Sequence, residues 1–154
     1  ACTASGGRDE SPEAAVGGEL TAVYFGTDRN RRDVSNPEKF YGEKRGVYEH
    51  GIALVGGAQK HVKNQLTSVE PLQSEDFLQQ LQLAVQQAPE PTVVVFVHGY
   101  LRSFQKASKL VAEFSVNTNL QGVPVLWSWP PPSNPAGYTV DETNEKWSRT
   151  QLAQ

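Results

Sequence analysis

The sequence is poor in several features that would point to particular classes of protein. It has one cysteine, Cys2, among 154 residues, so no internal disulfide can form. No C-x-x-C pair occurs, and His50, His61 and His98 lack the spacing of metal ligands, so we predict neither a metal site nor a cofactor. No apolar run approaches the roughly 20 residues that a membrane span needs. With 14 basic and 17 acidic residues and no basic stripe among aromatic residues, nucleic-acid binding is not predicted.

Residues 1–18 predict a flexible N-terminal tether. They are small or charged and include almost no large apolar side chain, so burial cannot offset the entropy of ordering them. An unmodified, disordered N-terminus is favoured, but Ala-Cys followed by small polar residues resembles the processing site of bacterial lipoproteins, which would imply lipidation of Cys2 and a place at the cell envelope. A processed lipoprotein begins at its cysteine, whereas Ala1 precedes Cys2 here, so an unmodified cytoplasmic protein is the alternative.

The ordered part of the chain is predicted to begin near residue 20. β-Branched and aromatic residues over 20–25 indicate a strand that ends at Gly26. Residues 27–33 (TDRNRRD) predict a polar turn. Its three arginines could hold a phosphate, but a solvated loop, with two aspartates offsetting part of the charge, is favoured. Residues 48–55 predict a second strand and 61–69 a third extended segment.

From Ser74 onward, helices and strands alternate. Ser74 is predicted to cap a helix whose apolar residues share one face. Residues 92–97 (TVVVFV) form a continuous run that predicts a strand covered on both faces, as in a parallel sheet. Ser103 predicts a second capped helix, 123–127 another buried strand, and Asp141 the start of a third helix. This alternation predicts an α/β fold with a doubly wound, mostly parallel sheet in three layers.

His98, Gly99 and Tyr100 follow the predicted strand 92–97 directly. In open α/β folds, ligands bind at the carboxyl edge of such strands. Glycine allows a sharp turn that aims the next backbone N–H into the crevice. An amide fixed there can stabilise a developing oxyanion by roughly 3 kcal/mol. The alternative is that His98-Gly99 is only a tight turn.

Three motifs occur in order along the chain: F-G-T-D-R at 25–29, H-G-Y at 98–100 and S-W-P at 128–130. Together they resemble a bacterial family of α/β-hydrolases of largely uncharacterised function. The resemblance covers 20–154 and implies that residues 19–154 are the N-terminal part of a hydrolase domain, with a fold incomplete at the C-terminus.

The resemblance also implies roles for individual residues. The backbone N–H of Tyr100 would be an oxyanion donor, Gly99 would supply the turn, and His98 would be a structural residue at the strand end. Trp127 and Trp129 could line an acyl pocket, with ordinary core or loop packing as the alternative. The family usually has Asn after H-G-Y, whereas this chain has Leu101, so any side-chain hydrogen bond from that position is lost.

A nucleophile is not found in the sequence. In this fold the triad follows the order nucleophile, acid, histidine, so His98 is not a candidate for the catalytic histidine. No serine has glycine both two residues before and two residues after it. We therefore predict the N-terminal fragment of an esterase-like serine hydrolase, inactive alone, whose nucleophile lies roughly 20 residues beyond Gln154. The intact protein would act on a small acyl substrate.

Three other functions are considered. A non-catalytic α/β binding or scaffold module is the main alternative. A nucleotide-binding domain ranks last, because it needs a glycine-rich loop and Gly99 stands alone. A dyad of Ser103 and His98 is disfavoured, because Ser103 is a predicted helix cap and nothing is seen to orient the histidine. A missing nucleophile strand would leave one side of 92–97 unpaired, which predicts self-association of the fragment.

Overall fold

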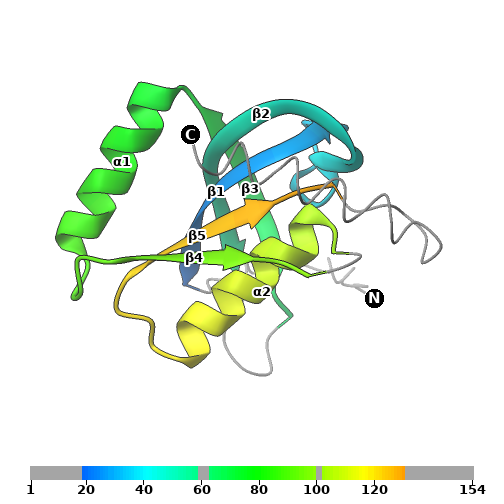
Figure 1. The fold of residues 1–154 in the computed structure, drawn as a ribbon. Helices are drawn as coiled ribbons and strands as arrows, with labels where there is room; N and C mark the ends of the chain where they lie inside the picture. The colour runs from blue at the N-terminus through cyan, green and yellow to red at the C-terminus, as the bar shows by residue number, and fades with distance from the viewer. Residues whose placement is uncertain (1–18, 59–62, 100–101, 131–154) are drawn as a thin grey trace, which may run out of the picture.

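The computed structural model describes residues 19–58, 63–99 and 102–130. They form a five-stranded sheet of order β3-β2-β1-β5-β4 together with two α-helices and a short 3-10 helix (Figure 1). In chain order the elements are β1 (Leu20–Arg31), η1 (Pro37–Lys39), β2 (Tyr41–Gly56), β3 (Gln65–Leu72), α1 (Ser74–Gln87), β4 (Val93–Val97), α2 (Phe104–Asn117) and β5 (Val123–Ser128). The predicted tether and Cys2, together with His61, Tyr100, Leu101 and the helix from Asp141, lie outside the described residues.

The sheet is mixed, which agrees with the predicted α/β class but not with a mostly parallel sheet. β1, β5 and β4 run parallel, whereas β2 is antiparallel to both β1 and β3. Loop length explains the difference: nine residues, 32–40, join β1 to β2, and a parallel connection needs a crossover of a dozen or more. α2 supplies such a crossover between β4 and β5.

β1 continues through the segment 27–31, where the sequence predicted a polar turn, so that prediction is wrong. The strand stays paired with β2 as far as Arg31 opposite Tyr41, with register shifts on either side of Arg29. Thr27, Asp28 and Arg29 are buried rather than solvated. The long-range pairing with β2, which begins earlier than the predicted strand 48–55, keeps this polar segment extended.

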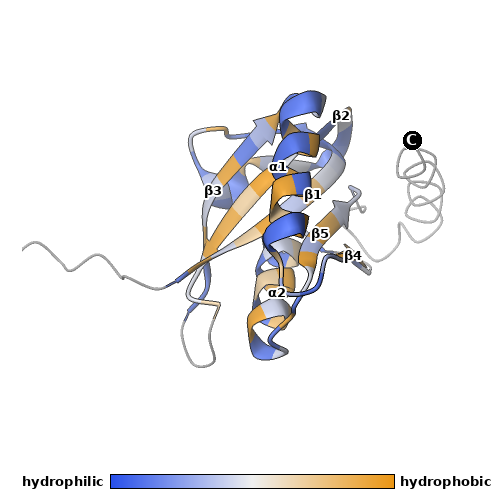
Figure 2. Cartoon of the chain, turned by 90° about the vertical axis from the view of Figure 1, so that its left-hand side faces the viewer, coloured by the Kyte–Doolittle hydropathy of each residue, from blue (hydrophilic) through white to orange (hydrophobic). Residues whose placement is uncertain are grey.

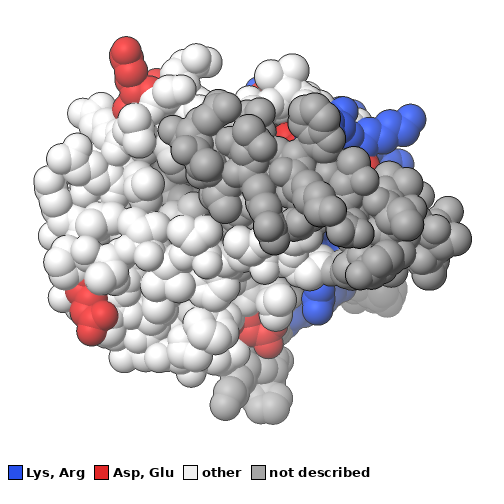
Figure 3. Space-filling model, viewed as in Figure 1, with Lys and Arg blue, Asp and Glu red and all other residues white. Residues whose placement is uncertain are grey.

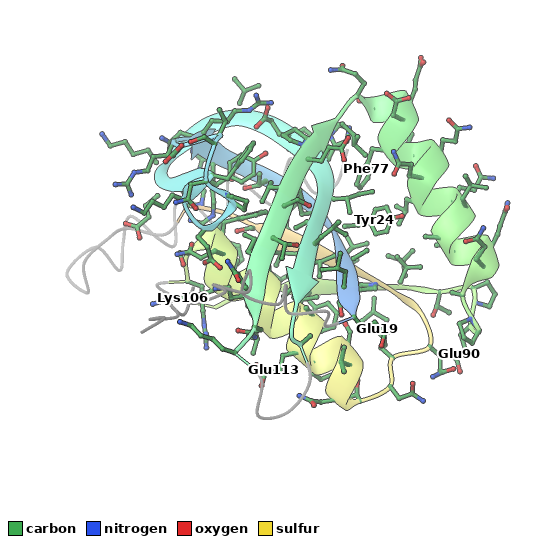
Figure 4. The ribbon with its side chains drawn as sticks, turned by 180° about the vertical axis from the view of Figure 1, so that it is seen from behind. Glu19, Tyr24, Phe77, Glu90, Lys106 and Glu113 are labelled. Atoms are coloured by element: carbon green, nitrogen blue, oxygen red, sulfur yellow. The ribbon has the colours of Figure 1, made fainter. Side chains whose placement is uncertain are left out.

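The two helices contact opposite faces of β1. Successive strand residues point to opposite faces of a sheet. Tyr24 contacts the ring of Phe77 in α1 at 6.0 Å, whereas its neighbour Phe25 contacts the ring of Phe104 in α2 at 5.0 Å. Figure 4 shows Tyr24 and Phe77 directed toward each other between strand and helix. Hydrophilic residues cover much of the outer surface of α1, and hydrophobic residues lie along the strands behind it (Figure 2).

The helix starts differ slightly from their predictions. Gln73, not Ser74, is the N-cap of α1, and Ser74 is its first helical residue. Ser103 is the N-cap of α2 as predicted, but its side chain makes no capping hydrogen bond. Both helices have the predicted apolar face; the face of α2 packs on the core with buried Phe104, Ala107 and Val111.

β4 lies at the edge of the described sheet, and the described residues do not cover both of its faces. Among the described strands it pairs with β5 alone. Val93, Val95 and Val97 are 43%, 50% and 55% exposed, while Phe96 is half-buried on the α2 side. The apolar run at 92–97 therefore predicted the strand correctly. Coverage of both faces is not seen among the described residues, whereas the unpaired side expected without a nucleophile strand is. The third extended segment, predicted over 61–69, overlaps β3 at 65–69, and β3 forms the opposite edge of the described sheet.

Candidate functional site

Three chain segments converge at one edge of the sheet. Because β1, β5 and β4 are parallel, their carboxyl ends lie at the same edge, and antiparallel β2 begins there. This arrangement brings together Arg29 near the end of β1, Ser128 at the end of β5 and His98 directly after β4. All three side chains are buried. Ligands bind at this edge in open α/β folds.

Arg29 makes most of the contacts among these segments. Its side chain is 1% exposed. Nε donates to Ser128 Oγ at 2.8 Å, and Nη1 donates to the backbone oxygen of Gly42 at 3.1 Å. Nη2 donates to the backbone oxygen of Arg102 at 2.6 Å and lies 3.3 Å from His98 Nε2. The guanidinium thus joins β2, β5 and both sides of the loop that follows β4.

His98 is held in one orientation by its neighbours. Its ring stacks on Trp129 with centroids 4.0 Å apart and planes inclined by 15°. Nδ1 lies 2.8 Å from the Gly99 oxygen and therefore carries the proton that it donates there. Nε2, left as the acceptor, lies near Arg29 Nη2 and 3.1 Å from Ser128 Oγ.

These surroundings keep His98 neutral. Burial lowers the pKa of His98 to about 4, and the Arg29 charge adds to the lowering, while the hydrogen bond to the Gly99 carbonyl opposes it. A general base works best with a pKa near the operating pH. His98 is therefore poorly suited to that role near pH 7, and its role as a structural residue at the strand end stays a prediction.

Neither the backbone conformation at position 99 nor the packing of the described residues requires a glycine there. Among the described glycines, positive φ occurs at Gly57 and not at Gly99. A Cβ built on Gly99 meets no heavy atom within 4 Å. At Gly122, by contrast, such a Cβ would lie 2.9 Å from the Thr92 carbonyl oxygen. The predicted turn at Gly99 continues into residues outside the described ranges and stays a prediction, and Gly99 borders open space.

Neither serine near the site is a good nucleophile. Ser128 is fully buried, and its hydroxyl is engaged by Arg29 and lies against His98. Ser103 makes no hydrogen bond to His98, and its buried Oγ has no hydrogen-bond partner. The structure therefore pairs His98 with Ser128 and gives no support to the Ser103–His98 dyad.

Trp127 and Trp129 are both buried, and each packs against a different aromatic residue. Trp127 is 4% exposed and contacts Tyr48, and Trp129 is 5% exposed and stacks on His98. An apolar pocket of about 280 Å³ lies between β4 and α2, and neither tryptophan lines it. The indole Nε1–H of Trp129 has no hydrogen-bond acceptor in the part of the chain that the structure describes. Their predicted role in an acyl pocket stays a prediction.

Two ion pairs lie at this edge. Asp28 forms an ion pair with Arg45, and Arg31 forms one with Glu49 at 2.5 Å. In Figure 3, Lys and Arg side chains gather on the right, where β1 ends and β2 begins. Within the described ranges no group of His, Cys, Asp or Glu could hold a metal ion. Neither α1 nor α2 has the length and apolar character that a membrane crossing requires.

Sequence reasoning gave no role to the side chains of Arg29 and Ser128, although both lie in motifs that carry the family resemblance, F-G-T-D-R at 25–29 and S-W-P at 128–130. By its polar neighbours, Arg29 was also placed in a solvated turn. Their partners lie 13 to 99 residues away along the chain, at Gly42, His98, Arg102 and each other. No local pattern indicates contacts of that range. The register shifts around Arg29 mark the place in the structure, since such irregularities often redirect a side chain beside a site.

Comparison with known families gives a match for the second half of the chain. Residues 73–154, slightly more than half of the sequence, match the family described as alpha/beta hydrolase of unknown function (DUF900). The matched region includes α1, β4, α2, β5 and the His98-Gly99 segment. Comparison with curated proteins and with solved structures gives no match.

Proposed function

Because the chain belongs to this family of alpha/beta hydrolases of unknown function, we propose that it is part of a serine hydrolase acting on small carboxylic esters. The loop after β4 supplies one amide of the oxyanion hole, the backbone N–H of Tyr100. In this fold one oxyanion amide comes from that loop, and the second from the residue after the nucleophile.

The observation that carries this proposal is the open space beside Gly99. A glycine that neither a positive φ nor a neighbouring atom requires is explained when a ligand approaches the backbone closely. Gly99 lies at the carboxyl edge of parallel strands, where such ligands bind. The neighbouring His98 is fixed and neutral, so it adds no mobile charge beside the reacting group.

The nucleophile in this proposal lies outside the 154 residues. None of their serines has the G-x-S-x-G pattern that places a serine at the top of the sheet. Ser128 is closed off by its contacts with Arg29 and His98. Helices on opposite faces of β1 support a three-layer arrangement, in which the nucleophile strand would pair with the side of β4 that has no partner among the described strands.

The test compares two proteins: the 154-residue chain and the product of the gene read through the codons after Gln154. Both are assayed with p-nitrophenyl butyrate and with a serine-reactive fluorophosphonate. We expect a G-x-S-x-G in the longer protein, and hydrolysis and labelling in that protein alone. Turnover by the 154-residue chain that Ser103→Ala abolishes would overturn the proposal. Inactivity of both proteins would favour the binding or scaffold module.

A further inference from the structure

The apolar pocket of about 280 Å³ lies between β4 and α2, where the helix passes in front of the strands in Figure 1. Its lining includes Ala107 and Leu126, which are fully buried, and Leu110 and Phe114, which are about half-exposed. The pocket therefore has a closed apolar floor and an open side along the helix. Among the described residues that line it, His98 alone is polar.

One end of the pocket lies beside the open space at Gly99. His98 lines the pocket and also lies with Nδ1 2.8 Å from the Gly99 carbonyl oxygen. A Cβ built on Gly99 meets no heavy atom within 4 Å, so this glycine borders space that a ligand can enter. Burial lowers the pKa of His98 to about 4, so its ring is neutral near pH 7. An apolar ligand that reaches from Gly99 into the pocket thus meets no charged lining residue.

We propose that this pocket binds the acyl chain of the substrate, and that the substrates are esters of unbranched aliphatic acids of about six to eight carbons. This inference rests on the proposed function and specifies its substrate class. The lining residues of α2 run from Ala107 to Phe114, about 10 Å along the helix axis. With C–C bonds of about 1.5 Å, an extended chain of about eight carbons covers that distance.

The nucleophile strand expected beside β4 does not compete for this space. Strands pair in the plane of a sheet, whereas side chains stand above its two faces. The unpaired side of β4 among the described strands lies in that plane. The pocket lies above the face that carries Phe96, whose ring contacts Phe114 of α2 at 5.2 Å. A strand added at the edge therefore leaves the space under α2 for the acyl chain.

The first measurement is kcat/KM of the longer protein defined above for p-nitrophenyl esters from acetate to decanoate. Each methylene removed from water should raise kcat/KM by about 2- to 4-fold as far as octanoate. The last carbons of decanoate would extend beyond the pocket and should add little. Equal kcat/KM for acetate and octanoate would overturn the proposal.

The variant Leu110→Gln places a polar amide in the pocket wall, and Val116→Gln is its matched control. Both residues lie on α2, with exposed fractions of 46% and 39%, but Val116 does not line the pocket. Leu110→Gln should lower kcat/KM for octanoate by about 5-fold or more, because the acyl chain would desolvate the amide, and should leave acetate within about 2-fold. Val116→Gln should match the parent protein for both esters. No loss in Leu110→Gln, or an equal loss in both variants, would overturn the proposal.

The second measurement does not depend on catalysis. Sodium octanoate is titrated into the 154-residue chain and followed by the NMR shifts of backbone amides. The amides of Phe96, Ala107 and Leu110 should shift and saturate, and the Kd should rise by about 5-fold or more in Leu110→Gln and stay unchanged in Val116→Gln. Shifts at these amides that follow protein concentration without octanoate would assign the pocket to a second copy of the chain and overturn the proposal.

The two measurements together separate this inference from the proposed function. If the parent protein hydrolyses no ester but octanoate binds as expected, the proposed function fails and the pocket remains an aliphatic-chain site. If esters are hydrolysed but octanoate leaves the amides of Phe96, Ala107 and Leu110 unchanged, the acyl pocket fails and the proposed function stands.

Discussion

The substitution Gly99→Ala distinguishes two explanations for the glycine that follows β4: a need of the fold and the close approach of a ligand. If glycine served the fold, a side chain there would strain the backbone or strike a neighbour. Neither occurs, since φ is not positive and a Cβ meets nothing within 4 Å. At such a position Gly→Ala reduces the entropy of the unfolded chain and raises the free energy of unfolding by about 0.4–1 kcal/mol. Gly99→Ala should therefore be neutral to slightly stabilising.

The same methyl group should impair catalysis. It would occupy the open space in which we place the acyl group of the substrate, next to the Tyr100 amide. Loss of one oxyanion donor costs roughly 10²–10³ in kcat. A displaced donor costs less, so we expect Gly99→Ala to lower kcat/KM by about 10- to 100-fold in the longer protein.

A second glycine serves as the control for stability. A Cβ at Gly51, where β2 pairs with β3, would overlap the Glu70 carbonyl oxygen and lie 2.8 Å from Pro71 Cα. Backbone atoms cannot move aside cheaply, so Gly51→Ala should lower the free energy of unfolding by about 1–3 kcal/mol.

Urea denaturation followed by tryptophan fluorescence, with hydrolysis of p-nitrophenyl butyrate, measures both effects. A loss of more than about 1.5 kcal/mol of stability in Gly99→Ala would show that the fold requires this glycine. Full activity in Gly99→Ala would show that no ligand approaches it. Either result would refute the reasoning.

Three further predictions concern the pH dependence of stability, the edge of the sheet and the core. His98 has a pKa of about 4 when folded and near 6.5 when unfolded, so the unfolded state binds the proton first. The free energy of unfolding should therefore fall, by up to about 3 kcal/mol, as the pH drops from 6.5 to 4. Urea denaturation at pH 7.5 and 4.5 should show this fall in the parent and a smaller one in His98→Gln; equal falls would contradict it. The 154-residue chain should self-associate through β4, because the described strands leave one side of β4 unpaired. Val95 is half-exposed on that strand, so Val95→Lys should lower the sedimentation coefficient toward the monomer value. A parent chain that stays monomeric at high concentration would exclude self-association through β4. Phe104→Ala should lower the free energy of unfolding by about 3–5 kcal/mol, because its ring is 1% exposed and packs on Phe25 and Tyr41; a loss below about 1 kcal/mol in urea denaturation would contradict that packing.

The helices and most strands follow from local sequence. The apolar period of about 3.6 residues over 74–87 and 104–117 and the apolar runs at 93–97 and 123–127 mark α1, α2, β4 and β5 closely. Helical periodicity depends on neighbours three and four positions away, so it is present in the sequence itself. The H-G segment after β4 was located in the same way, by its place at the end of an apolar run.

The position of each strand in the sheet and the burial of Arg29 depend on contacts between residues that are distant in sequence. The run at 92–97 is equally compatible with a central strand and an edge strand, because β-branched residues favour extended backbone in either place; the strand order made β4 an edge. Arg29 lies in a polar segment that predicts a turn, and it is buried because Gly42, His98, Arg102 and Ser128 meet it from elsewhere in the chain. The sequence by itself determined which segments are helical or extended. The tertiary structure alone determined which polar groups are desolvated together, because the free energy of burying a charge depends on acceptors that only the folded chain brings within hydrogen-bonding distance.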